Sequence, residues 1–245
     1  YHNHVKLVSR AWEEGFYMRP RTDHEDLEKY HEGLIVCSAC IAGEVPHKIL
    51  ENDIEGARQS IEWHKRIFGD DYYLELQRHE VTDPNVRANR ETYPLQQKAN
   101  KILVELAREY GVKLVCTNDC HFVDKDNAEA HDHLLCLATG KDLDDPTRML
   151  YSKQEWFKTR EEMNDIFSDI PEALTNTLEI LDKVETYNIN HDPIMPFFPI
   201  PESFGTEDDI RRKYSEEDLF REFTSDENGE NQLPVEEGQK KIDHL

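Results

Sequence analysis

One short polar motif in this sequence has the residue types and spacing of a metal site. Asp119 and His121 are separated by one residue and follow an apolar run over 113–117 that is typical of a buried strand. A carboxylate and an imidazole two residues apart can both face a divalent cation where a strand leaves its sheet. Such pairs are common, and an aspartate that caps a turn explains the same pattern. The pair alone leaves both interpretations open.

Four cysteines offer a second candidate set of ligands. Cys37 with Cys40, and Cys116 with Cys120, have spacings that recur in structural zinc sites. Cys37 and Cys116 fall inside apolar runs, where a cysteine is usually a small core residue, so the core interpretation is favoured. The chain has five cysteines, an odd number scattered along the sequence, which does not fit a disulfide framework.

Two His-x-His pairs are explained by helices instead. His2 with His4, and His131 with His133, lie in helical patterns, where residues two apart point about 200° away from each other. Neither pair can therefore bind one ion. The three tryptophans occupy apolar helical positions and are predicted to be core residues: Trp12, Trp63 and Trp156.

The elements that position these groups alternate between strands and helices. Three short apolar runs predict buried strands, at 34–37, 72–76 and 113–117. Helical patterns of about 15 residues separate them, the second of which is predicted to end at Gly111. This alternation predicts parallel strands in a sheet or barrel. The loops at the strand ends, where such folds place their chemistry, are 38–40, 77–79 and 118–121. Glu75 and His79 bracket the second strand end and fit a site or a solvated edge equally well.

Helix signals cover most of the remaining chain. A first helix closes at Gly15, and a second begins at a predicted capping box of Thr22 with Glu25. Further helices are predicted at 131–137, 161–167 and 171–184, then at 206–223 and 235–245 after a polar turn over 226–231. Prolines between 193 and 201 indicate an extended linker, so a domain boundary is predicted within 187–205.

Charge and hydropathy exclude several function classes. The chain has 52 acidic and 29 basic residues, a formal net charge of −23, and no basic stripe. It would repel a polyanion at long range, so this surface is not expected to grip DNA. No apolar run approaches a membrane span and no secretion signal opens the chain, which predicts a cytoplasmic protein.

Six segments, in this order, resemble the bacterial DNA polymerase III alpha subunits: EGFYMRPRTD, GLIVCSACIAGE, YYLELQRHE, LVCTNDCHF, HDHLLCLATGK and DIPEALTNTLEI. The resemblance covers residues 1 to about 201. It implies an α/β fold, part of a distorted (β/α)7 PHP-type barrel, followed by the mostly helical start of a palm domain. It assigns 1–186 to the C-terminal part of the PHP domain, 187–205 to a proline-rich linker and 206–245 to the start of the palm region.

The same resemblance implies a metal site built from Cys40, Asp119 and His121. Ala39 replaces the glycine of the family's Ser-Gly-Cys turn. The remaining ligands of that family would lie before Tyr1, and no ligand role follows for Glu75 or His79. Divalent ions, zinc, manganese or magnesium, would then support phosphodiester hydrolysis, as in 3′–5′ proofreading. Members of the family that lack the ligands use the barrel as a scaffold.

The resemblance further implies the setting of DNA replication. The parent protein would be a DNA-directed DNA polymerase acting on primer-template DNA and deoxynucleotides, with a sliding clamp, a clamp loader and a proofreading exonuclease subunit as partners. Its palm aspartates and their magnesium would lie after Leu245, so this chain is not expected to polymerise DNA. Two alternatives stay open: a stand-alone PHP metal-dependent phosphoesterase, and a non-catalytic interaction module for a separate proofreading subunit.

Overall fold

The chain divides into two compact units, Tyr1–Thr186 and Tyr187–Leu245. The computed structural model describes residues 1–81, 91–197, 199 and 201–213, and isolated positions at 215, 218, 220, 221, 224, 225, 233, 234, 236 and 237. The predicted turn over 226–231 and most of the predicted helix over 235–245 lie outside the described residues.

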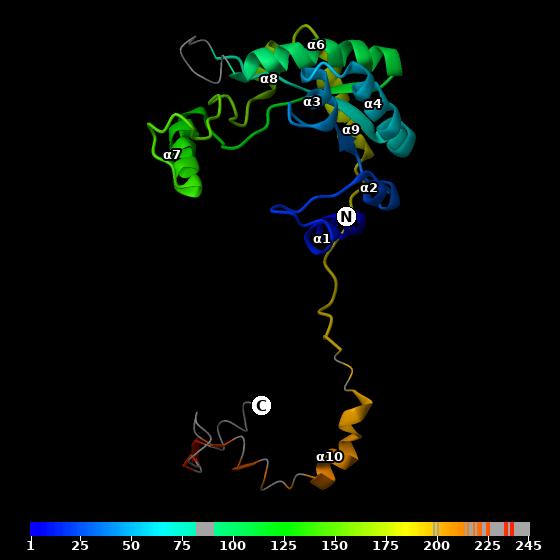
Figure 1. The fold of residues 1–245 in the computed structure, drawn as a ribbon, viewed down its shortest axis with the longest axis vertical. Helices are drawn as coiled ribbons and strands as arrows, with labels where there is room; N and C mark the ends of the chain where they lie inside the picture. Colours follow the sequence, from blue (N-terminus) through cyan, green and yellow to red (C-terminus); the bar gives the residue numbers. More distant parts are fainter. Residues whose placement is uncertain are drawn as a thin grey trace. The chain divides into compact units, whose positions relative to one another are not determined.

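A three-stranded parallel sheet forms the centre of the first unit (Figure 1). Its strands are β1 (Val36–Cys37), β2 (Tyr72–Gln77) and β3 (Lys113–Thr117), in the order β1-β2-β3. Val36 lies opposite Tyr72, and Tyr73 lies opposite Lys113. All three strands were predicted from their apolar runs, and within the described residues they form an open sheet.

Crossover helices connect and cover these strands, as parallel pairing requires. Between β1 and β2 the chain forms α3 (Glu44–Leu50), α4 (Ile54–Phe68) and a 3-10 turn, η1 (Gly69–Asp71). Helix α6 (Tyr93–Tyr110) follows β2, and α8 (Arg160–Ile166) and α9 (Pro171–Lys183) come after β3. Helix α6 ends at Gly111, whose φ of 60° is the left-handed conformation that glycine adopts without strain, as the sequence predicts.

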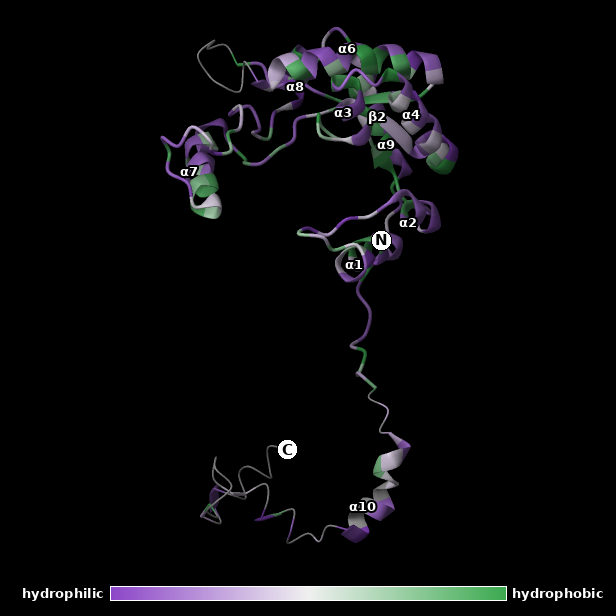
Figure 2. Cartoon of the chain, viewed as in Figure 1, coloured by the Kyte–Doolittle hydropathy of each residue, from purple (hydrophilic) through white to green (hydrophobic). Residues whose placement is uncertain are grey.

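The core lies where these helices meet the sheet. Leu74 and Leu76 alternate with Tyr73 along β2 and are fully buried, together with Leu103 of α6 and Ile61 of α4. Figure 2 shows apolar residues concentrated along β2 and the neighbouring helix faces. Burial of each such side chain contributes roughly 1.5–3 kcal/mol, which holds the strand ends in fixed positions.

The first two helices differ from the prediction at the start of α2. Helix α1 covers His2–Glu13 and α2 covers His24–Lys29. The capping residue of α2 is Asp23, whose carboxylate accepts a hydrogen bond from the Asp26 N–H at 2.9 Å. The predicted Thr22 and Glu25 capping box is therefore wrong. Aspartate caps at least as well as threonine, so the helix starts one residue later and Glu25 no longer occupies the third helical position.

The tryptophan predictions were only partly right. Trp63 packs against the core, as predicted. Trp12 is 59 % exposed and stacks on Phe16 with ring centroids 5.6 Å apart, so its assignment to the core is wrong. Helix α1 instead buries Leu7 and Ala11, which lie four residues apart on one face, and this turns Trp12 away.

The later helices follow the predicted order. A 3-10 turn, η2 (Lys125–Asn127), leads into α7 (Ala128–Thr139), and residues 184–197 have no regular secondary structure. In the second unit the described elements are η3 (Glu202–Phe204) and α10 (Glu207–Lys213), which begins the helix predicted over 206–223. No helix in the described part of the chain is both long and apolar enough to cross a membrane.

Candidate functional site

The turn after β1 positions Cys40 through two constrained residues. Ala39 has a φ of 62°, a left-handed conformation that costs a non-glycine residue roughly 1–2 kcal/mol. The Gly43 N–H donates to the Cys40 carbonyl at 2.8 Å, and a Cβ on Gly43 would lie 2.0 Å from the Ser38 carbonyl oxygen. The Ser38 hydroxyl accepts from the Glu75 N–H at 2.8 Å, which ties the turn to β2.

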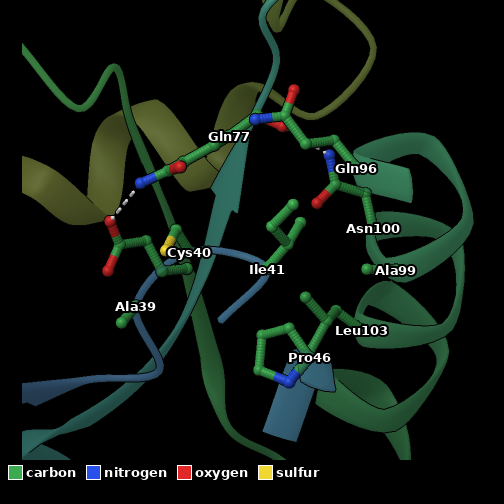
Figure 3. A pocket seen from close by; sticks show the side chains of 10 residues that line it. Ala39, Cys40, Ile41, Pro46, Gln77, Gln96, Ala99, Asn100 and Leu103 are labelled. Carbon is green, nitrogen blue, oxygen red and sulfur yellow. Dashed lines mark hydrogen bonds between the residues drawn. The ribbon is translucent and has the colours of Figure 1, made fainter. Parts of the chain in front are cut away.

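Cys40 and Ile41 line a small pocket beside the end of β2 and α6, with Gln77, Gln96 and Asn100 (Figure 3). The Asn100 side chain donates to the Gln77 carbonyl at 2.9 Å, and this bond holds α6 against the last residue of the strand. The turn that carries Cys40 is therefore anchored on β2, and residues of α6 form the facing wall of the pocket.

Glu75 connects the ends of β2 and β3. Its Oε1 accepts a hydrogen bond from Gln77 Nε2 at 3.2 Å and another from the Thr117 hydroxyl. Gln77 Nε2 also contacts Thr117 Oγ1 at 3.2 Å. The Glu75 carboxylate is thus partly occupied by structural hydrogen bonds. It lies on the same side of the sheet as Thr117, because Thr117 pairs with Gln77 and residues two apart on a strand share a face.

His79 is buried and forms hydrogen bonds with both α6 and the loop after β3. The Gln96 Oε1 accepts from the His79 backbone N–H at 2.9 Å, so the Gln96 amide nitrogen faces His79 Nδ1, at 3.0 Å, and donates to it. His79 Nε2 then carries the proton and donates to the Asn118 carbonyl at 3.1 Å. Desolvation lowers the pKa of His79, which agrees with a neutral ring. His79 therefore holds the loop after β3 against α6.

Asn118 docks a distant segment onto that loop. Its side-chain nitrogen donates to the Gln154 and Trp156 carbonyls at 2.9 and 2.8 Å. The His121 N–H donates to the Glu155 carbonyl at 2.8 Å. Residues 154–156 therefore form one wall of the region around the end of β3.

Asp119 and His121 face each other, as their spacing suggests. Asp119 Oδ1 lies 3.4 Å from His121 Nε2, and the two side chains are 43 % and 33 % exposed. Asp119 has a φ of 48°, which turns the chain sharply at this point. The His121 ring contacts Tyr151, with centroids 4.5 Å apart, and His131, with centroids 5.6 Å apart. The pair is thus supported by aromatic rings and open to solvent.

Glu155 adds a buried carboxylate that sequence patterns do not reveal. It is 2 % exposed; its Oε1 accepts from the Ser152 N–H at 3.0 Å and from the Ser152 hydroxyl, while Oε2 has no hydrogen-bond partner. Desolvation, then the negative charges of Asp119, Glu155 and Cys40, raise the pKa of Tyr151. These acidic groups therefore lie near enough to the Tyr151 phenol to act on it electrostatically.

Lys158 is the nearby basic group. Desolvation lowers its pKa to about 8, although the charge of Glu155 acts in the opposite direction. Its amino group donates to the Gln154 carbonyl and lies 3.4 Å from the centre of the Trp156 ring. Trp156 is partly buried and serves as the support of this ammonium group.

The predicted metal ligands are brought together only in part. Asp119 and His121 are adjacent, whereas Cys40 is not close enough to both for the three donor atoms to lie within 4.8 Å of one another. In the described part of the chain, a trio that meets this distance is His24, Glu44 and His64. A carboxylate, an imidazole and a thiol suit zinc chemically, and the unpartnered Glu155 oxygen is a further potential donor.

The structure argues against a zinc site built from the four paired cysteines. All five cysteines are free, and Cys116 is buried within β3. Desolvation raises the pKa of Cys37 and of Cys116 to about 11, so both remain thiols at neutral pH and are poor zinc ligands.

Comparison with known proteins shows what the chain is similar to. Residues 1–79 match the PHP domain family. The chain is 43 % identical to the DNA polymerase III subunit alpha of Borreliella burgdorferi, in an alignment covering 84 % of this chain and 17 % of that protein. It is 37 % identical to that of Thermus aquaticus, covering 82 % and 16 %, and 34 % identical to that of Campylobacter jejuni, covering 86 % and 17 %.

The chain thus spans about one sixth of the length of these relatives. The aligned part nevertheless takes in more than four fifths of this chain in each case, so the likeness is not confined to one motif. The chain is therefore homologous to a segment of the DNA polymerase III alpha subunits, and its first 79 residues match the PHP domain family.

Proposed function

We propose that this chain works as part of a DNA-directed DNA polymerase, the alpha subunit of a bacterial replicase, in the cytoplasm. The observation that carries the proposal is the 43 % identity over 84 % of the chain to one such subunit. In this role the parent protein acts on primer-template DNA and deoxynucleotides with palm-bound magnesium. Its partners are a sliding clamp, a clamp loader and a proofreading exonuclease subunit.

Within that protein the first unit is proposed to belong to a seven-stranded PHP barrel that binds divalent metal. Three parallel strands with their loops gathered at the carboxyl edge support this arrangement. Cys40, Asp119 and His121 are the proposed ligands for zinc, manganese or magnesium. The 3.4 Å approach of Asp119 to His121, at a solvent-open position, supports their part in it.

The chemistry proposed for this edge is phosphodiester hydrolysis, as in removal of a nucleotide from a primer 3′ end. Bound divalent ions would supply an activated water and stabilise the leaving oxygen. The residues of the chain hold the ligands in place: His79 fixes the loop that carries Asp119, and Tyr151 packs on the His121 ring at 4.5 Å. Both contacts reduce the freedom of the ligands before a metal binds.

Metal content and nuclease activity of the full-length parent protein test this proposal. The protein is compared with a Cys40→Ser and Asp119→Asn double variant and with Asp144→Asn, which changes an exposed aspartate elsewhere. We expect the double variant to lose bound manganese or zinc and to release fewer single nucleotides from a primer 3′ end. Equal metal content in the parent and double variant would refute the metal role of these residues.

A scaffold role is the second candidate, and one observation favours it. Cys40 is not within single-ion reach of both Asp119 and His121. A barrel that keeps its shape without binding metal would serve as a docking surface for a separate proofreading subunit. In this case the full-length protein would bind no divalent ion at this edge yet would still capture that subunit.

We propose that the chain consists of part of one domain, a linker and the start of a second domain. Residues 1–186 belong to the PHP domain, 187–205 to a linker and 206–245 to the start of the palm region. The absence of regular secondary structure over 184–197, within the described residues, supports the position of the linker. Limited proteolysis of the folded protein tests the division, since first cleavage inside 187–205 is expected and first cleavage within 113–183 would contradict it.

A further inference from the structure

Two histidines and a glutamate from three helices meet at the opposite end of β2 from the Asp119 and His121 pair. His24 opens α2, Glu44 opens α3 and His64 lies in α4, and one donor atom from each lies within 4.8 Å of the others. The His64 ring stacks on Tyr72, the first residue of β2, at 4.8 Å. The strand is six residues long, so this group lies roughly 17 Å from its carboxyl end.

His64 is held in the form that binds a metal. Its Nδ1 donates to the Ser60 carbonyl at 2.8 Å, which leaves the lone pair on Nε2. Metal-binding histidines usually fix their second nitrogen on such an acceptor. Desolvation lowers the pKa of His64, which favours the neutral ring. A neutral imidazole with a fixed tautomer is prepared for coordination.

Glu44 contributes an ionised carboxylate. One oxygen lies 2.8 Å from His24 Nε2 and the other accepts from Lys48 at 3.2 Å. Desolvation would raise its pKa, but hydrogen bonds from His24, Lys48 and Ser60 together lower it to about 2. The group therefore carries its charge at neutral pH.

Aromatic rings fix both imidazoles. His24 stacks on Trp63, with centroids 4.0 Å apart and an interplanar angle of 13°. Tyr72 stacks on His64 at an angle of 16°, and its hydroxyl is buried without a hydrogen-bond partner. The charge of Glu44 contributes to raising the pKa of this phenol, after desolvation, so the hydroxyl lies close to the group. A water molecule on a metal ion would give it a partner.

We propose that His24, Glu44 and His64 bind a zinc ion that joins α2 to α3 and α4. Two imidazoles and one carboxylate, with water in a fourth position, form a recurring zinc donor set. Neither a local motif nor the family resemblance assigns these residues, and they are separate from the ligands proposed at the carboxyl edge of the sheet. The ion would fix α2, a short helix with no buried residue, against the rest of the unit.

Zinc titration of the purified 245-residue chain against a chromophoric chelator tests the proposal. The variants are His24→Gln and Glu44→Gln, whose side chains are 46 % and 35 % exposed and tolerate an amide. The matched control is His47→Gln, which changes an exposed histidine of α3 that lies 3.5 Å from Glu51. We expect each test variant to bind one zinc ion on the order of 100-fold more weakly than the unsubstituted chain. The control should bind zinc as tightly as the unsubstituted chain.

Cobalt substitution separates this site from the one at the carboxyl edge. Cobalt bound to nitrogen and oxygen ligands at this site should give visible absorption in the unsubstituted chain. The same absorption is expected in the His47→Gln control and in an Asp119→Asn variant. The His24→Gln and Glu44→Gln variants should lose it while their circular dichroism stays unchanged. Folded test variants that bind zinc and cobalt like the unsubstituted chain would overturn the proposal. Loss of binding in Asp119→Asn alone would place the ion at the other site.

Discussion

Replacing Asn118 with alanine tests whether residues 154–156 hold the end of β3 in place. The side chain is buried and donates to the Gln154 and Trp156 carbonyls at 2.9 and 2.8 Å. Each carbonyl keeps another donor, because Gln154 also accepts from Lys158 and Trp156 from the Cys120 thiol. The substitution therefore removes two hydrogen bonds but leaves neither carbonyl without a donor. At about 1 kcal/mol for each bond, the free energy of unfolding should fall by about 2 kcal/mol.

Urea denaturation followed by circular dichroism measures this loss as a change in the free energy of unfolding. In thermal unfolding the same change corresponds to a melting temperature about 4–8 °C lower for a protein of this size. The matched control is Asn3→Ala, which removes a single exposed bond of 2.9 Å to the Glu32 carbonyl. It should cost less than about 0.5 kcal/mol.

An Asn118→Ala variant as stable as Asn3→Ala would contradict this expectation. The docking of residues 154–156 would then not contribute to stability, and the wall beside Asp119 would form independently of these hydrogen bonds. A further expectation follows at the site itself: the variant should expose the Trp156 ring, seen as a red shift of its fluorescence, because the segment is no longer held against the loop.

Three further outcomes are expected. Ala39→Gly should raise the free energy of unfolding by up to about 1 kcal/mol in urea denaturation, since glycine relieves a φ of 62°, whereas Ala57→Gly within α4 should lower it by about 1 kcal/mol or more. Between pH 8 and 10.5 the free energy of unfolding of the unsubstituted chain should rise relative to that of Lys158→Met. The reason is that the folded chain releases the Lys158 proton near pH 8, whereas the unfolded chain releases it near pH 10.5. A constant difference in pH-dependent denaturation would contradict the lowered pKa. Mass spectrometry after alkylation at neutral pH should find exposed Cys120 modified before buried Cys116, and the reverse order would contradict the burial of β3.

Local sequence patterns predicted the regular elements well because those patterns reflect local physics. Apolar runs at 72–76 and 113–117 predicted buried strands, and each was confirmed within one residue. The stop of α6 at Gly111 was confirmed, because glycine adopts the left-handed conformation that closes this helix without strain. The errors at Thr22 and Trp12 arose where two residues competed for one role: Asp23 is the better cap, and α1 buries a different face.

Neighbouring residues along the chain specify the alternation of strands and helices, the polar loops after the strands, and the approach of Asp119 to His121. Tertiary packing, in contrast, specifies which distant groups meet. The burial of Glu155 and the meeting of His24, Glu44 and His64 depend on how separate elements pack, and no short-range spacing encodes them. Side chains far apart in sequence are brought together by the shared core that fixes the helices on the sheet.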